Sequence, residues 1–151
     1  MRFSLLFLLA TGIVFAQKYT GPRPPKPDLL YLVHADNLIP TEQAEASQEK
    51  DKYIVPGASS PARTPLAEPI FIIDADKIQP QSIELYRMEV KGGKREVTIS
   101  SRRGRGSHAL RLSVTPLEGR LYKIEADEEL ENGEYALSPN GSNTVFCFQV
   151  Y

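Results

Sequence analysis

The chain has 151 residues, of which 18 are Lys or Arg and 19 are Asp or Glu, with a formal net charge of −1, one cysteine and no tryptophan. This balance excludes the positive excess with which proteins bind nucleic acid or an anionic membrane surface, so we expect no nucleic-acid partner. A lone cysteine excludes an internal disulfide.

Residues 1–16 have the features of a secretory signal peptide. Arg2 precedes an apolar run over residues 3–15, and Val14 and Ala16 place small residues at the −3 and −1 positions of a cleavage site. The run is shorter than the roughly 20 apolar residues of a membrane helix. We expect cleavage after Ala16, with no transmembrane span afterwards. The protein would then be exported, to the periplasm or the extracellular space. An uncleaved anchor is the alternative.

Prolines are concentrated in the first half of the chain, where residues 17–80 hold ten of the 12. Residues 17–28 contain four of them and predict an extended, solvated, Pro-rich leader. We interpret the leader as a spacer, with a tether or a docking peptide as the alternative. Proline cannot donate to a β-ladder, so residues 29–69 are expected to form an irregular region with short accessory strands.

Within that region the expected strands are residues 29–34 and 53–55, which are short and apolar. Residues 41–52 have helix-forming side chains but no apolar face, which predicts a solvated helical turn or a loose surface loop. The four prolines of residues 56–69 predict an extended loop or an edge segment that crosses the surface.

From residue 70 onward apolar residues recur regularly and predict a β-sandwich domain over residues 70–151. The expected strands are residues 70–73, 83–90, 95–100, 110–115, 122–127, 135–138 and 144–150. Gly92-Gly93 and Asn140-Gly141 are hairpin-turn pairs. Eight or nine strands in all, with no amphipathic helix of useful length, indicate an all-β sandwich or barrel.

The last expected strand has apolar residues on both faces, which is typical of a central strand covered on each side. Cys147 lies inside it and is predicted to be a buried, inert thiol. A nucleophilic cysteine would need a nearby base and partial exposure.

Residues 130–135 read Leu-Glu-Asn-Gly-Glu-Tyr. They resemble the L-x-P-G-x-Y tyrosine corner of immunoglobulin-like and fibronectin-type-III-like Greek-key sandwiches, with Asn132 in place of proline. The resemblance covers about 20 residues; the disulfide and core tryptophan of antibody domains are absent. It implies a structural tyrosine corner of Leu130, Gly133 and Tyr135 within a single Ig-like Greek-key β-sandwich. It implies no ligand.

Opposite charges are gathered in two segments. Residues 87–111 carry eight Lys or Arg against two Glu, and residues 125–134 carry six acidic residues and no basic one. The Gly-rich stretch with Arg102, Arg103 and Arg105 is our predicted interaction loop, suited to phosphate or an acidic partner. The alternative is that both segments are solvated hairpin ends.

The sequence offers no convergent set of catalytic or metal-binding residues, and we predict no catalytic residue, metal or cofactor. Asp74 and Asp76 supply only part of the six to eight oxygens of a Ca²⁺ site. His34 and His108 have no metal-ligand spacing. The serines near residue 60 lack the G-x-S-x-G pattern of a hydrolase elbow.

These observations favour an exported, non-enzymatic β-sandwich module for protein recognition or assembly at the cell envelope. Its partner would be another envelope or extracellular protein, or a second copy of itself. One alternative is a structural fibre or envelope subunit that self-associates by strand addition. The other alternative is a small secreted hydrolase.

Overall fold

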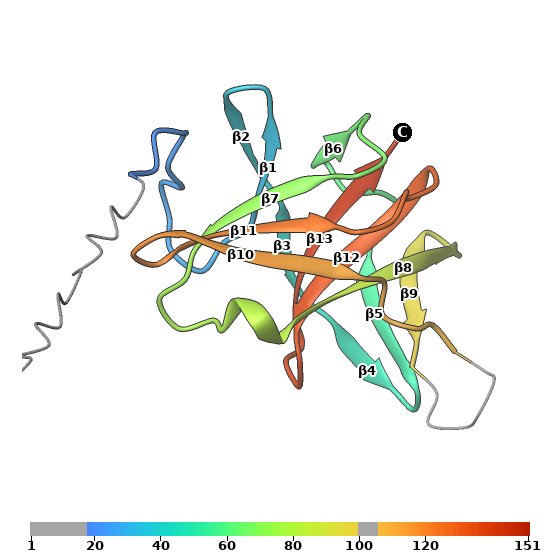
Figure 1. The fold of residues 1–151 in the computed structure, drawn as a ribbon. Helices are drawn as coiled ribbons and strands as arrows, with labels where there is room; N and C mark the ends of the chain where they lie inside the picture. Colours follow the sequence, from blue (N-terminus) through green and yellow to red (C-terminus); the bar gives the residue numbers. More distant parts are fainter. Residues whose placement is uncertain (1–17, 100–105) are drawn as a thin grey trace, which may run out of the picture.

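The structure, a computed structural model, describes residues 18–99 and 106–151, and almost all of its regular structure is β-strand (Figure 1). The first six strands are β1 (Tyr31–His34), β2 (Asn37–Pro40), β3 (Glu42–Glu45), β4 (Ser47–Glu49), β5 (Lys52–Pro56) and β6 (Arg63–Thr64). The others are β7 (Ile70–Asp74), β8 (Ile83–Lys91), β9 (Lys94–Thr98), β10 (Leu112–Glu118), β11 (Leu121–Ala126), β12 (Gly133–Pro139) and β13 (Thr144–Val150). A short 3-10 turn, η1 (Pro80–Ser82), precedes β8. The predicted all-β class is confirmed.

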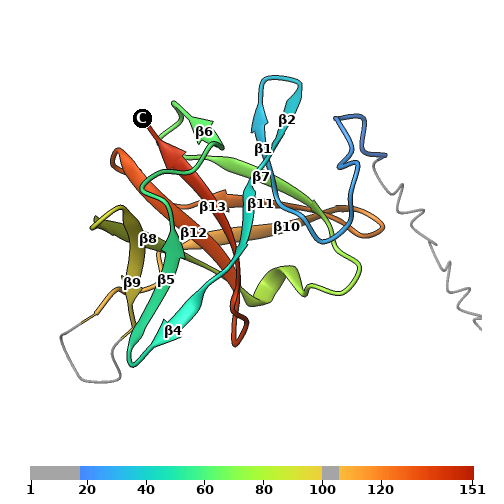
Figure 2. The ribbon, with the colours of Figure 1, turned by 180° about the vertical axis from the view of Figure 1, so that it is seen from behind.

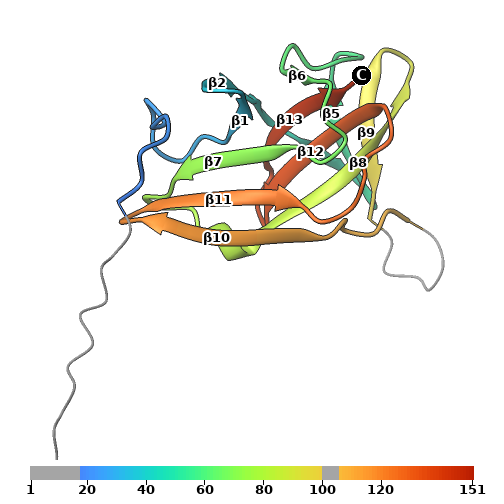
Figure 3. The ribbon, with the colours of Figure 1, turned by 45° about the horizontal axis from the view of Figure 1, so that its top comes forward.

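The strands form two sheets, antiparallel except where β6 runs parallel to β13. One sheet has five strands in the order β10-β11-β7-β1-β2. The other has eight, in the order β3-β13-β12-β8-β9-β5-β4 with β6 beside β13. Figure 3 shows β7, β11 and β10 lying across β13, β12 and β8, so the two sheets are packed face to face there.

The eight-stranded sheet is nearly closed and barrel-like. β3 and β4 follow one another with only Ala46 between them, yet β3 pairs with β13 and β4 pairs with β5, at opposite ends of the strand order. Figure 2 shows β4 beside β5, with β9 next in line. This closure was not part of the expected single Ig-like Greek-key sandwich, and the relationship to that superfamily stays a prediction.

The central strand β13 separates two hydrophobic cores. Phe146, Phe148 and Val150 pack in the core between the two sheets, whereas Val145 and Cys147 pack inside the barrel-like sheet. This two-sided burial explains the apolar residues on both faces of the strand. Cys147 is fully buried, and burial raises the pKa of its thiol to about 12, so the thiol is not a nucleophile at neutral pH.

Strands are present at all the positions expected after residue 70, and the two predicted turn pairs connect β8 to β9 and β12 to β13. Gly141 has a positive φ of 77°, which glycine adopts without strain. The expected total of eight or nine strands is wrong, because the described residues form 13.

The helical turn or loose loop expected over residues 41–52 is also wrong, because this segment forms β3, β4 and the start of β5. Ala44 and Ala46 point to the barrel interior and alternate with exposed polar residues. Alanine is too small and too common in helices to mark a strand, so the alternation was missed. Residues 29–69 thus supply six strands, and four of them, β1, β3, β5 and β6, pair with strands that follow residue 69.

The Pro-rich leader is exposed or half-buried over residues 18–28 and contacts the rest of the protein at a few points, and its role as a spacer stays a prediction. The Tyr19 N–H donates to the carboxylate of Glu118 at 3.0 Å, and Arg23 forms an ion pair with the same carboxylate at 2.7 Å. The Asp28 carboxylate accepts three backbone N–H groups of residues 76–78. The leader therefore lies on the loops at one end of the five-stranded sheet.

No helix in residues 18–99 or 106–151 has the length and apolarity that crossing a membrane requires.

Candidate functional site

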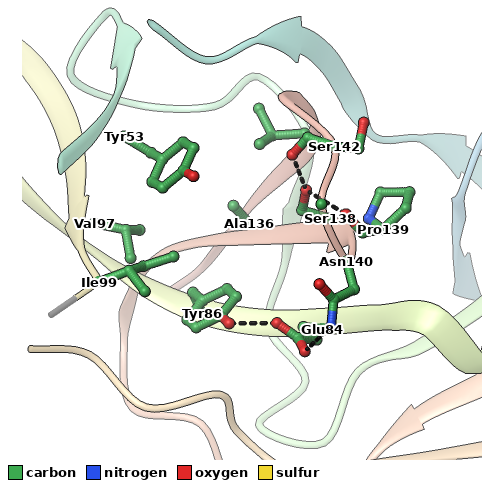
Figure 4. A pocket seen from close by; sticks show the side chains of 12 residues that line it. Tyr53, Glu84, Tyr86, Val97, Ile99, Ala136, Ser138, Pro139, Asn140 and Ser142 are labelled. Atoms are coloured by element: carbon green, nitrogen blue, oxygen red, sulfur yellow. Dashed lines mark hydrogen bonds between the residues drawn. The ribbon is translucent and has the colours of Figure 1, made fainter. Parts of the chain in front are cut away.

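A cavity opens in the barrel-like sheet where two strands separate. The pairing of β8 with β9 stops at Glu89 and Glu96, although both strands continue. Beyond this point β9 remains paired with β5, and β8 remains paired with β12. The two ribbons diverge and leave a cavity of about 290 Å³ between them (Figure 4). We call it the barrel cavity.

The walls of the barrel cavity are mainly apolar and aromatic. Tyr53 of β5 and Val97 of β9, with Ile99 just beyond, come from one ribbon, and Tyr86 of β8 and Ala136 of β12 come from the other. In Figure 4, Ala136 lies between the Tyr53 and Tyr86 rings. Ligand sites in proteins are concave, mostly apolar, and found in the mouths of β-barrels among other places. The barrel cavity has this character, at the small end of the usual size range of about 300–1,000 Å³.

A few polar groups converge on one side of the cavity. The Tyr86 hydroxyl donates to Oε2 of Glu84, and the side-chain amide of Asn140 donates to Oε1 of the same carboxylate at 3.1 Å. Ser138 Oγ donates to the carbonyl of Thr144 at 2.9 Å. Burial, with the hydrogen bond to the negatively charged Glu84, raises the pKa of Tyr86, so its hydroxyl stays a protonated donor.

Few of the lining residues that the structure describes have ionisable side chains. Among the lining residues that the structure describes, Glu84 is the only acid, and there is no histidine, cysteine, lysine or arginine. Ser138 Oγ donates to a backbone carbonyl and forms no hydrogen bond with Glu84, its cross-strand partner. Nucleophilic catalysis needs a nucleophile and a base within hydrogen-bond reach, which these lining residues do not supply.

The interior of the barrel-like sheet also holds a buried charged cluster, which we call the arginine clamp: Arg95, Glu42 and Glu134. Arg95 is fully buried, and its Nη1 and Nη2 donate to the two oxygens of Glu42 at 2.6 and 2.9 Å. Its Nε donates to the carbonyl of Gly57 at 2.9 Å. Glu134 accepts the backbone N–H of Ser60 at 3.0 Å, and its oxygen lies 3.8 Å from Arg95.

The arginine clamp is a structural device. It joins β3 to the end of β5, two strands that do not pair directly, and so completes the closure of the sheet. The hydrogen bonds from Arg95 lower the pKa of Glu42. Burial raises the pKa of Glu134, whose Oε1 has no hydrogen-bond partner among the described residues.

The predicted interaction loop of Arg102, Arg103 and Arg105 lies outside the described residues. Its role stays a prediction.

The residues of the proposed tyrosine corner lie together. The Tyr135 hydroxyl donates to the carbonyl of Glu131 at 2.7 Å, and its ring, 1% exposed, stacks on Phe148. Leu130 is buried in the same core. Gly133 begins β12 without a left-handed backbone, so the conformational freedom of glycine is not what this position requires.

The other residues considered from the sequence do not form a site. Asp74 and Asp76 are both paired with Arg120, at 2.7 and 3.0 Å. His34 and His108 are exposed. In the part of the chain that the structure describes, no group of three or more His, Cys, Asp or Glu side chains is placed to hold a metal ion.

The two charged segments meet within the molecule. The pairs are Arg87–Glu131, Arg111–Glu128 at 3.4 Å and Arg95–Glu134 at 3.8 Å. Part of the charge that was expected to face a partner or the solvent is therefore balanced internally.

The residues of the barrel cavity were not identified from the sequence. Asn140 was identified only as a turn residue, and Tyr53, Glu84 and Tyr86 only as members of strands. They come from β5, β8 and the β12–β13 turn. Their convergence depends on the separation of β8 from β9, for which the sequence holds no local signal.

The chain matches no protein-family model, no curated protein and no solved structure.

Proposed function

We propose that this protein is an exported, non-enzymatic binding module that recognises another envelope or extracellular protein through the barrel cavity. The observation that carries the proposal is the cavity itself: an apolar and aromatic hollow of about 290 Å³ with a fixed group of polar atoms on one side. Its size suits a side chain or a short segment of a partner better than a large cofactor.

Two further observations support this proposal. The polar atoms of the cavity are held by hydrogen bonds within the protein, so little ordering is needed when a partner binds. The features of a signal peptide in residues 1–16 support export, which gives the module access to envelope proteins.

The proposal is tested by comparing two variants of the full chain as bait in an envelope extract of its source. Ile99→Ser changes the rim of the cavity, and Leu66→Ser is the matched control, because the two side chains are 40% and 41% exposed. We expect Ile99→Ser to reduce capture of a discrete partner by about tenfold, since an aliphatic contact that a partner covers contributes about 1–2 kcal/mol. Leu66→Ser should capture it as the unaltered protein does.

Equal capture by Ile99→Ser and by the unaltered protein would overturn the assignment of the cavity. Circular dichroism of both variants establishes that each is folded.

A further inference from the structure

The barrel cavity has the charge of a cation site. Of the lining residues that the structure describes, Glu84 is the one charged residue and none is basic. A bound group that carries a positive charge would therefore meet one carboxylate and no opposing cation in the described wall.

The Glu84 carboxylate is oriented before any ligand arrives. Each of its oxygens accepts one hydrogen bond, from Tyr86 to Oε2 and from Asn140 to Oε1. A carboxylate has about four acceptor positions, so each oxygen keeps room for a further donor. Both neighbours are neutral donors, and the negative charge of Glu84 is not balanced by them.

The rest of the wall suits a hydrocarbon chain that ends in a cation. Tyr53, Val97 and Ile99 present aromatic and aliphatic surface opposite Glu84 and Tyr86. Tyrosine rings attract a cation placed over their faces within about 6 Å of the ring centre. The cavity therefore combines a carboxylate, two aromatic rings and an apolar wall.

We propose that the barrel cavity binds an alkylammonium group, with the positive nitrogen at Glu84 and the aliphatic chain along Tyr53 and Ile99. A lysine side chain of a partner protein has this form, and so does a free aliphatic amine.

This inference rests on the proposed function, since it names the chemical group that the cavity takes from a partner. The test uses the ¹⁵N-labelled full chain titrated with lysine blocked at both ends as its acetyl and methylamide derivative. Blocked norleucine, which has a similar chain without the charge, is the control ligand. A second arm uses 1,4-diaminobutane as the free amine. Binding is followed by the shifts of the backbone amides of Ile99 and Gly141.

We expect blocked lysine to shift these amides saturably and blocked norleucine to bind at least tenfold more weakly. Glu84→Gln keeps the shape of the side chain and removes its charge, and should weaken blocked lysine at least tenfold. Glu49→Gln makes the same charge change at an exposed position of β4 and should leave binding unchanged.

If blocked lysine binds more tightly than the diamine, the natural ligand is a lysine side chain of a protein. If the diamine binds more tightly, the natural ligand is a free amine. Three outcomes would overturn the inference. They are equal binding of blocked lysine and blocked norleucine, no binding of either amine, and unchanged binding of blocked lysine by Glu84→Gln. In that case the proposed function still stands if Ile99→Ser loses its partner, so the two failures are distinguishable.

Discussion

Arg95 is the residue whose environment differs most from its appearance in the sequence. It belongs to a basic segment, yet it is fully buried and donates hydrogen bonds to Glu42, Gly57 and Pro56. A buried ion pair contributes little net free energy compared with apolar residues, but removing one partner leaves a buried charge uncompensated. Residue 42 lies 53 positions earlier, so the pairing has no local signal in the sequence.

We expect Arg95→Leu to lower the free energy of unfolding by about 3–5 kcal/mol, because the carboxylate of Glu42 is left unpaired. The double variant Arg95→Leu/Glu42→Leu should recover most of this loss. Denaturant unfolding measures both. Lys94→Leu, at an exposed neighbouring position of β9, is the control and should change stability by less than about 0.5 kcal/mol. A double variant as unstable as the single one would contradict this account.

At the scale of elements, the free edges of the five-stranded sheet are β2 and β10 in the described part of the chain. β10 contains Pro116, which has no N–H to donate, and its pairing with β11 is interrupted between Pro116 and Glu118. β2 is four residues long and ends at Pro40. Short, proline-containing and irregular edges resist pairing with another chain.

We therefore expect the protein not to polymerise by strand addition as its concentration rises. Sedimentation velocity over a wide concentration range should show one constant species. The variant Pro116→Thr restores an N–H on the edge and should associate more readily. Concentration-dependent fibres of the unaltered protein would instead favour the fibre-subunit alternative.

The elements also show what local pattern can and cannot predict. The sequence predicts β11 because Tyr122, Ile124 and Ala126 alternate with polar residues, and all three pack in the core between the sheets. The sequence does not indicate β3, because its inward side chains are small or charged and find their partners far along the chain. It does not indicate β4 either, because all three residues of that strand are polar and exposed. The sequence does not indicate the barrel cavity either, because the cavity lies where the pairing of β8 with β9 ends. Where two strands stop pairing depends on both segments and cannot be predicted from the pattern of one.

For the whole molecule, the arginine clamp gives stability a defined pH dependence. Burial raises the pKa of Glu134 above that of the unfolded chain, so the folded state binds the proton more readily and gains stability as pH falls through the raised pKa. Hydrogen bonds from Arg95 lower the pKa of Glu42, so its contribution is present above the unfolded value and is lost as pH falls through the lowered pKa. Stability should therefore be greatest between these two transitions, in mildly acidic solution.

We expect the free energy of unfolding to rise as the pH falls through the raised pKa of Glu134, and to fall again as the pH drops through the lowered pKa of Glu42. Glu134→Gln should abolish the rise in the free energy of unfolding, because an amide does not titrate. The same variant should keep the fall in stability at lower pH, which belongs to Glu42. Glu129→Gln, at an exposed position, should behave as the unaltered protein does. Urea unfolding at a series of pH values measures the free energy of unfolding of the unaltered protein and of both variants. If Glu134→Gln keeps the full rise, the rise in stability belongs to another titrating group.

The place of β13 between two cores has a consequence for the order of folding. Both cores contain its side chains, and its direct neighbours β12 and β3 lie about 10 and 100 positions away along the chain. Neither core can be completed before β13 has left the ribosome. Because β3 and β13 are separated by about 100 positions along the chain, bringing them together is entropically costly, and folding is expected to be slow. The two cores are then expected to form together, once β13 is available to both of them.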